Sequence, residues 1–100
     1  MRRVIVRYKV KPELVGENEQ LIRTVFEELA RVQPAGLRYA SFKLADGVSF
    51  VHVASIETPE GNPLTALASF KAFSRDIAAR CDEAPVALDA EPIGNYRVFG

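Results

Sequence analysis

Residues 3–10 alternate between two sets of side chains, which is the pattern of a β-strand with one covered face. One set is Val4, Val6, Tyr8 and Val10, and the other is Ile5, Arg7 and Lys9. We expect the strand to end before Pro12, because proline has no N–H to donate to a sheet. A helix is predicted over residues 17–33, where apolar residues recur at intervals of three and four. Pro34 and Gly36 are expected to end it.

Residues 37–45 and 48–57 are rich in aromatic and β-branched side chains, and Asp46-Gly47 separates them. This dipeptide favours a two-residue type I′ turn, so we predict a hairpin in which Ser41 lies opposite His52. Alternation then divides the hairpin into two faces. The more apolar face is expected to meet the helices, and it carries Ala40, Phe42, Leu44, Val51 and Val53. The other face carries Tyr39, Ser41, Lys43, Phe50, His52 and Ile56.

A second helix is predicted to begin at Pro63, capped by Asn62, and to continue with helical periodicity to Cys81. Residues 86–98 alternate loosely and contain Pro92 and Gly94, which predicts an edge strand or an exchanged strand with a break. The order βαββαβ favours an α+β, ferredoxin-like fold, with a four-stranded antiparallel sheet and two helices on one face. We expect Ile5, Tyr39, Phe50 and Ile56 on the uncovered face, where a second sheet would cover them in a homodimer that encloses a cavity.

Composition narrows the class of protein. The chain has 100 residues, 48% of them hydrophobic, and a formal net charge of zero, which predicts one domain over residues 1–100 and no nucleic-acid partner. The strand order also occurs in RNA-recognition domains, but the segment 46–53 begins with an acidic residue where their motif is basic. One cysteine, no apolar run long enough for a bilayer and no signal-peptide core favour a cytoplasmic protein without a membrane partner. With one histidine and no ligand spacing among the acids, no metal site is expected.

Four segments, at 6–13, 36–42, 50–57 and 70–73, resemble the antibiotic biosynthesis monooxygenase family of dimeric α/β barrels. Their sequences here are Val-Arg-Tyr-Lys-Val-Lys-Pro-Glu, Gly-Leu-Arg-Tyr-Ala-Ser-Phe, Phe-Val-His-Val-Ala-Ser-Ile-Glu and Phe-Lys-Ala-Phe. The resemblance implies a homodimer with a ligand cavity and, in some members, cofactor-free oxidation of polyphenols or quinols by dioxygen. It also implies that His52 and Ile56 line the cavity, at positions where members acting on aromatic polyketides carry Asn and Trp. Haem is disfavoured, because residues 69–80 contain no histidine where the haem-degrading members carry their axial ligand.

His52 is the candidate catalytic residue, because imidazole accepts protons near neutral pH. It would remove a phenolic or carbon-bound proton from the ligand; alternatively, it is a structural histidine bonded to Ser41 or to the partner chain. Arg7 either holds an anionic oxygen in the cavity or forms a surface or interface ion pair. Tyr39 and Phe50 either stack on an aromatic ligand or pack in the dimer. Hairpin register adds Ser41 to the cavity-lining set, and Cys81 is interpreted as a small buried hydrophobe.

Two functions therefore remain open from the sequence. The first is a cofactor-independent monooxygenase or related enzyme that acts on a small aromatic ligand. The second is a dimeric barrel without catalysis that binds a small apolar ligand or only assembles. A proton-transfer enzyme that uses the same cavity without dioxygen is a third possibility.

Overall fold

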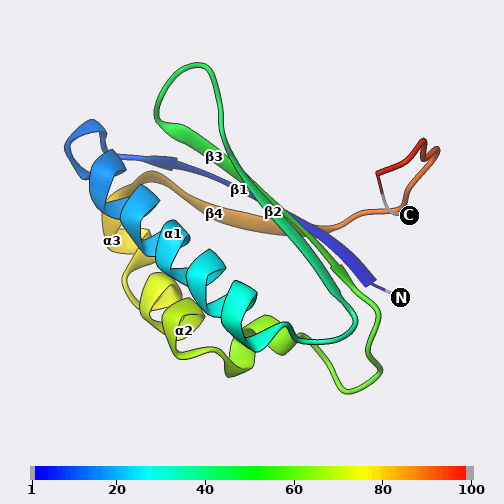
Figure 1. Cartoon of the computed structure of the whole chain (residues 1–100). Coiled ribbons are helices and arrows are strands. Elements are labelled where there is room, and N and C mark those ends of the chain that lie inside the picture. Colours follow the sequence, from blue (N-terminus) through cyan, green and yellow to red (C-terminus); the bar gives the residue numbers. More distant parts are fainter. Residues whose placement is uncertain (1, 99–100) are drawn as a thin grey trace.

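Four strands form one antiparallel sheet in a computed structural model that describes residues 2–98 of the chain. The strand order is β2-β3-β1-β4. Along the chain the elements are β1 (Arg2–Val10), η1 (Pro12–Leu14), α1 (Val15–Val32), β2 (Leu37–Lys43), β3 (Ser49–Ile56), η2 (Pro63–Ala66), α2 (Ala68–Arg75), α3 (Ile77–Arg80) and β4 (Cys81–Asp89). Figure 1 shows the helices gathered on one side of the sheet. The predicted α+β, ferredoxin-like fold is confirmed.

The prediction of one continuous second helix is wrong. This helix is divided into η2, α2 and α3 by two residues that leave helical geometry: Leu67 is extended, with φ −81° and ψ 131°, and Asp76 has φ −118° and ψ 22°. The apolar periodicity spans these breaks, because each short piece still presents its apolar residues to the sheet.

The last strand begins earlier and ends earlier than the predicted segment 86–98. Cys81, expected at the end of a helix, is the first residue of β4 and pairs with Val10. Its thiol is half-buried, and this burial raises its pKa. Pairing with β1 ends where the Ala90 N–H donates to the Arg3 carbonyl, shortly before Pro92. Beyond this point the described chain is irregular and exposed as far as Val98.

The hairpin has the predicted register but a different turn. Ser41 pairs with His52, as expected from the sequence. The hydrogen bond from the Leu44 N–H to the Ser49 carbonyl closes a loop of four residues, 45–48, instead of two, and the Gly47 N–H donates to the Leu44 carbonyl. The carboxylate of Asp46 accepts hydrogen bonds from the backbone of residues 48 and 49 within this loop. Two-residue and four-residue loops give the same pairing, so the change of turn leaves the register intact.

The predicted faces of the hairpin are inverted in the structure. Val6 pairs with His52, so His52 shares the sheet face of Val4, Val6 and Tyr8, which the helices cover. Phe50, His52, Ala54 and Ile56 are all buried, whereas the exposed fraction of Phe42 is 53%. The prediction failed because it assigned the more apolar set of hairpin side chains to the core. The polar side chains of the other set instead form hydrogen bonds with one another beneath the helices.

The opposite face of the sheet, here called the open face, carries two rows of side chains that cross all four strands. One row is Ala40, Val53, Ile5 and Leu88, and the other is Phe42, Val51, Arg7 and Val86. Ile5, Phe42, Val86 and Leu88 are exposed. Seven of these eight side chains are apolar, so this face is a large hydrophobic surface with one arginine in it.

In the part of the chain from Arg2 to Val98, no helix is both long enough and apolar enough to cross a membrane.

Gly36 lies in the connection between α1 and β2, where the backbone has φ +75°. A Cβ atom on this residue would lie 2.4 Å from the Thr58 methyl carbon. The Gly36 carbonyl also accepts a hydrogen bond from the Glu57 N–H at 2.7 Å, which holds the two segments together. Glycine is therefore required here both for its backbone conformation and for space.

We predict that Gly36→Ala lowers the free energy of unfolding by about 2–4 kcal/mol, because it adds steric overlap to left-handed strain. Gly47→Ala is the matched control, since Gly47 has φ +80° and no atom within 4 Å of its added Cβ. It should lose only about 1–2 kcal/mol from the strained backbone. Urea unfolding measures both variants, and equal losses would contradict the steric explanation.

Candidate active site

A cavity of about 250 Å³ lies between α2 and the helix-covered face of the sheet, and we call it the α2 cavity. Its walls are mainly apolar, with polar groups from a few positions. The helical side contributes Leu64, Phe70, Phe73, Ser74 and Ile77, and the sheet side contributes Val4, Val6, Tyr8, Tyr39, His52 and Ala54. Arg2, Asn62 and Pro85 complete the lining. Ligand pockets typically measure about 300–1,000 Å³, so this cavity suits a small ligand.

His52 lies in the wall of the α2 cavity with both ring nitrogens in hydrogen-bond contact. Its Nε2 is 2.6 Å from the Tyr8 hydroxyl, and its Nδ1 is 2.7 Å from both the Tyr39 hydroxyl and the Ser41 hydroxyl. Tyr8 comes from β1, while Tyr39 and Ser41 come from β2, so the central strand β3 presents the imidazole between its two neighbours. The exposed fraction of His52 is 3%.

Aromatic rings surround the imidazole. Its centroid lies 5.3 Å from that of Tyr8, 5.8 Å from that of Tyr39 and 5.4 Å from that of Phe73. Tyr8 also stacks on Phe50, with 5.5 Å between centroids and 10° between planes. The imidazole is thus packed against three aromatic rings, and its orientation is set by packing as well as by hydrogen bonds.

A buried arginine continues the hydrogen-bond network. The Arg80 Nε donates to the Asn18 Oδ1 at 3.1 Å, and the Asn18 Nδ2 donates to the Tyr8 hydroxyl at 3.0 Å. Asn18 is completely buried, and the exposed fraction of Arg80 is 4%. A second guanidinium nitrogen donates to the Phe73 carbonyl near the C-terminal end of α2, and the guanidinium carbon lies 5.3 Å from the centre of the Phe73 ring. A helix C-terminus and a ring face both attract a cation, which offsets the loss of its hydration.

The directions of these hydrogen bonds determine the tautomer of His52. A guanidinium has no acceptor, so Asn18 must turn its oxygen toward Arg80 and its NH₂ group toward Tyr8. The Tyr8 oxygen therefore accepts from Asn18, and we assign its own proton to Nε2 of His52, which is the only other hydrogen-bond partner of this hydroxyl among the described residues. The neutral ring then carries its proton on Nδ1, which donates toward Tyr39 and Ser41.

Burial shifts the titration of all three ring systems toward their neutral forms. It lowers the pKa of His52 to about 4 and raises the pKa of Tyr39 to about 12. It also raises the pKa of Tyr8 far above its usual value, against the opposing effects of the Asn18 hydrogen bond and the Arg80 charge. The sequence-based expectation of an imidazole that readily charges near neutral pH is therefore wrong for this environment.

The six residues singled out from the sequence are not all brought together. Tyr39, Ser41 and His52 form one hydrogen-bonded cluster. Phe50 is buried against Tyr8, at the side of the cluster, and Ile56 is buried on the same sheet face but does not line the α2 cavity. Arg7 is exposed on the open face, where its row neighbours are apolar, so it does not reach this cavity.

Sequence reasoning missed Tyr8, Asn18, Phe73 and Arg80 as parts of this site. One indication was present for Asn18, which precedes Leu21, Ile22 and Val25 at helical spacing and is a polar residue on the apolar side of α1. The sequence pattern gave Tyr8 only a place in the first strand and Phe73 only a place in the second helix, because their neighbours across the sheet were not predictable from local spacing.

Among residues 2–98, no group of three or more His, Cys, Asp or Glu side chains is arranged to hold a metal ion. The polar groups of the α2 cavity are an imidazole, phenols, a hydroxyl, an amide and a guanidinium. These side chains can donate and accept hydrogen bonds and transfer protons to an oxygen-bearing ligand.

Comparison with solved structures places the chain in the fold of antibiotic biosynthesis monooxygenases. One such monooxygenase is 21% identical, with a TM-score of 0.76 over 94% of this chain and all of the other chain. SnoaB, a cofactor-independent oxygenase from Streptomyces nogalater solved as a mutant, is 15% identical, with a TM-score of 0.70 over 96% of both chains. A conserved protein from Methanosarcina mazei is 17% identical, with a TM-score of 0.69 over 89% of both chains. Identities this low establish a shared fold and leave the reaction open.

No protein-family model matches the sequence. A search of curated proteins likewise finds no match.

The lowered pKa of His52 predicts a specific pH dependence of stability. The unfolded chain takes up a proton near pH 6.5, whereas the folded chain does so near pH 4, so the unfolded state binds more protons between these values. The free energy of unfolding should therefore fall by about 3 kcal/mol as the pH drops from 7 to 4. Urea unfolding at a series of pH values measures this slope.

The matched control is His52→Asn, which removes the only titrating histidine. Its stability should be nearly independent of pH between about 7 and 5, above the range where carboxylates titrate. A wild-type slope that survives in this variant would show that burial of the imidazole is not its cause.

Proposed function

We propose that the chain is a cofactor-independent monooxygenase that acts on a small aromatic ligand of the quinol or polyphenol type, bound in the α2 cavity. The observation that carries this proposal is the hydrogen-bonded cluster of Tyr8, Tyr39 and His52 in the wall of an apolar, ring-lined cavity. Apolar walls with a few convergent polar groups are typical of small-molecule sites. The fold shared with SnoaB, which is itself a cofactor-independent oxygenase, supports the same reaction class.

In the proposed reaction the ligand first loses a proton to the hydroxyl–imidazole cluster. The resulting electron-rich anion passes an electron to dioxygen, and the two radicals combine at the ring carbon. Collapse of the peroxide gives a carbonyl on the ligand and releases water, so dioxygen is the only oxidant. The surrounding rings of Tyr39, Phe70 and Phe73 would hold a flat ligand by stacking.

A second function is favoured by one specific observation. Both ring nitrogens of His52 are already in hydrogen-bond contact with neighbouring hydroxyls, as they would be in a histidine that only maintains structure. The alternative is a dimeric barrel that binds a small apolar ligand in the α2 cavity without transforming it.

We also propose that two copies of the chain pair through their open faces, forming a homodimeric α/β barrel. The two apolar rows that cross the sheet leave Ile5, Phe42 and Leu88 exposed on one copy, and a second sheet would cover them. A single domain over residues 1–100, a cytoplasmic location and the absence of a nucleic-acid partner remain predictions from composition.

Oxygen uptake with a panel of quinols and anthrones tests the enzymatic function. We expect His52→Ala to lower the rate by roughly 100-fold or more, because it removes the proton acceptor. Lys71→Ala, on the exposed side of α2, should leave the rate unchanged.

Displacement of a polarity-sensitive dye separates the alternatives: ligands that displace the dye without any oxygen uptake favour the binding protein. Turnover that continues without dioxygen would indicate an isomerase or decarboxylase.

Sedimentation velocity tests the homodimer. Ile5→Lys places a charge in the centre of the open face, between Val53 and Leu88, and should weaken self-association at least roughly tenfold, since about 1.4 kcal/mol suffices for this change. Arg75→Glu changes the charge on the exposed side of α2 and should not alter it. A wild-type chain that sediments as a monomer at micromolar concentration would rule out the proposed barrel.

A further inference from the structure

The hydroxyls of Tyr8 and Ser41, which contact different ring nitrogens of His52, line two different spaces, whereas Tyr39 contacts Nδ1 and lines the α2 cavity. Nε2 contacts the hydroxyl of Tyr8, whose side chain lines the α2 cavity. Nδ1 contacts the hydroxyl of Ser41, which lines a separate pocket of about 160 Å³ between α1 and β2. We call this second space the α1/β2 pocket. The imidazole therefore bridges the space where a ligand would bind and a second, distinct one.

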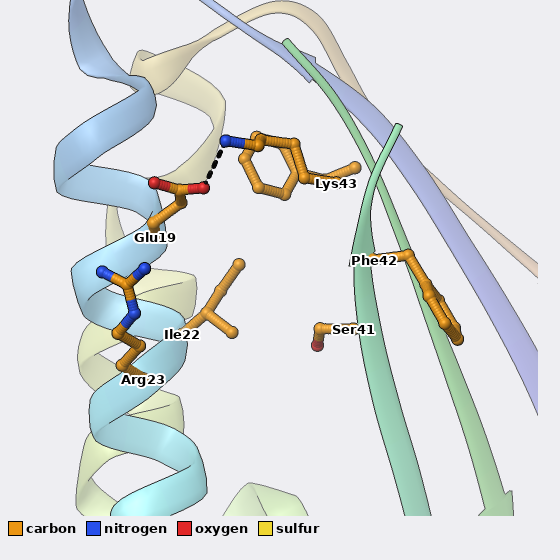
Figure 2. A pocket seen from close by; sticks show the side chains of 7 residues that line it. Glu19, Ile22, Arg23, Ser41, Phe42 and Lys43 are labelled. Atoms are coloured by element: carbon orange, nitrogen blue, oxygen red, sulfur yellow. Dashed lines mark ion pairs between the residues drawn. The ribbon is translucent and has the colours of Figure 1, made fainter. Parts of the chain in front are cut away.

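Figure 2 shows the α1/β2 pocket from close by. Ser41 and Lys43 extend from β2 toward α1, whereas Phe42 between them points away, as alternation along a strand requires. The charged groups that face Ser41 across this pocket are Glu19 and Arg23 from α1. Glu19 and Lys43 form an ion pair at 2.7 Å, and the hydrogen bond from Lys43 lowers the pKa of Glu19. Ser41 is thus the link between the buried imidazole and a partly exposed pocket that has both charged and apolar side chains in its lining.

The buried network defines a direction for proton movement. Arg80 and Asn18 orient the Tyr8 hydroxyl so that its proton points to Nε2, which leaves Nδ1 protonated and directed at Ser41 and Tyr39. The ring can therefore accept one proton at Nε2 while it releases another from Nδ1. The ring is neutral before and after such a double transfer. This suits a site where burial opposes the charged imidazolium, whose pKa is lowered to about 4.

We propose that Tyr8, His52 and Ser41 form a proton relay that connects the α2 cavity to the α1/β2 pocket, with Ser41 as the exit group. The ligand that supplies the proton rests on the proposed function, whereas the relay is a property of the protein alone. In the outward direction the ligand proton bonds to the Tyr8 oxygen as the Tyr8 proton moves to Nε2. The Nδ1 proton moves to the Ser41 oxygen, and the Ser41 proton passes to water. The reverse sequence returns one proton to the cavity, where reduction of dioxygen consumes it, and restores the resting tautomer.

Ser41 is a positioning and relay residue that acts through His52. Tyr39 contacts the same nitrogen, but its ring is stacked on Phe26 with 5.3 Å between centroids, which restricts its movement. The smaller serine hydroxyl rotates freely between an acceptor and a donor orientation, which a relay needs at each step. Removing the Tyr39 hydroxyl should therefore affect proton movement less than removing that of Ser41.

The relay can be tested without any ligand, because His52 is the only histidine in the chain. Protein labelled with ¹⁵N-histidine gives one pair of ring nitrogen signals in NMR spectra, and their chemical shifts identify the tautomer. We expect the Nδ1–H tautomer in the wild type at neutral pH. Observation of the Nε2–H tautomer would overturn the proposed direction of the network.

The exchange rate of the Nδ1 proton with water tests Ser41 itself. We expect Ser41→Ala to slow this exchange by about tenfold or more, because the variant removes one hydrogen-bonded step from the path of the proton to water. Ser41→Thr, which keeps a hydroxyl, should restore it, and Tyr39→Phe should change it less than Ser41→Ala. Unchanged or faster exchange in folded Ser41→Ala would overturn the relay.

Failure of the relay and failure of the proposed function give different results. Oxygen uptake by the wild type with normal proton exchange in Ser41→Ala would reject the relay alone. Slowed exchange in Ser41→Ala without oxygen uptake on any phenolic compound would support the relay and reject the oxygenase.

Discussion

The pairing of Val6 with His52 between the two central strands determines how the rest of the molecule is arranged. Successive side chains of a strand point to opposite faces, so this one contact places His52 and Tyr8 on the same face, beneath the helices. It also places Ile5 and Arg7 on the open face. A shift of one residue in this register would expose the imidazole and bury the apolar row, which would remove the site and the hydrophobic face together.

The site depends on a buried polar chain that is satisfied at each observed step. It runs from Arg80 through Asn18 and Tyr8 to His52, and it joins two helices to two strands. A buried cation is stable here because a carbonyl, a ring face and an amide oxygen replace its water. The same bonds orient the imidazole before any ligand arrives. One network thus contributes both to the packing of α1 and α3 on the sheet and to the chemistry of the α2 cavity.

The fold is shared with antibiotic biosynthesis monooxygenases at sequence identities too low to carry a reaction. The function therefore has to be argued from the cavity and the groups in its wall. In this chain each ring nitrogen of the imidazole contacts a hydroxyl, and the hydroxyls of Tyr8 and Ser41 line different spaces. The apolar rows of the open face are more favourably buried against another chain than exposed to water, so this face favours assembly.

The sequence by itself determined the order of strands and helices and the pairing of Ser41 with His52, since these follow from local periodicity and from a loop with an even number of residues. Tertiary structure alone decided which face meets the helices. In this sheet both faces carry apolar side chains, so the polarity of the hairpin favoured the wrong one. It also decided the two contacts of Asn18, which bonds to Tyr8 10 positions away along the chain and to Arg80 62 positions away. Such contacts depend on how separate elements pack, and no local pattern of residues specifies that.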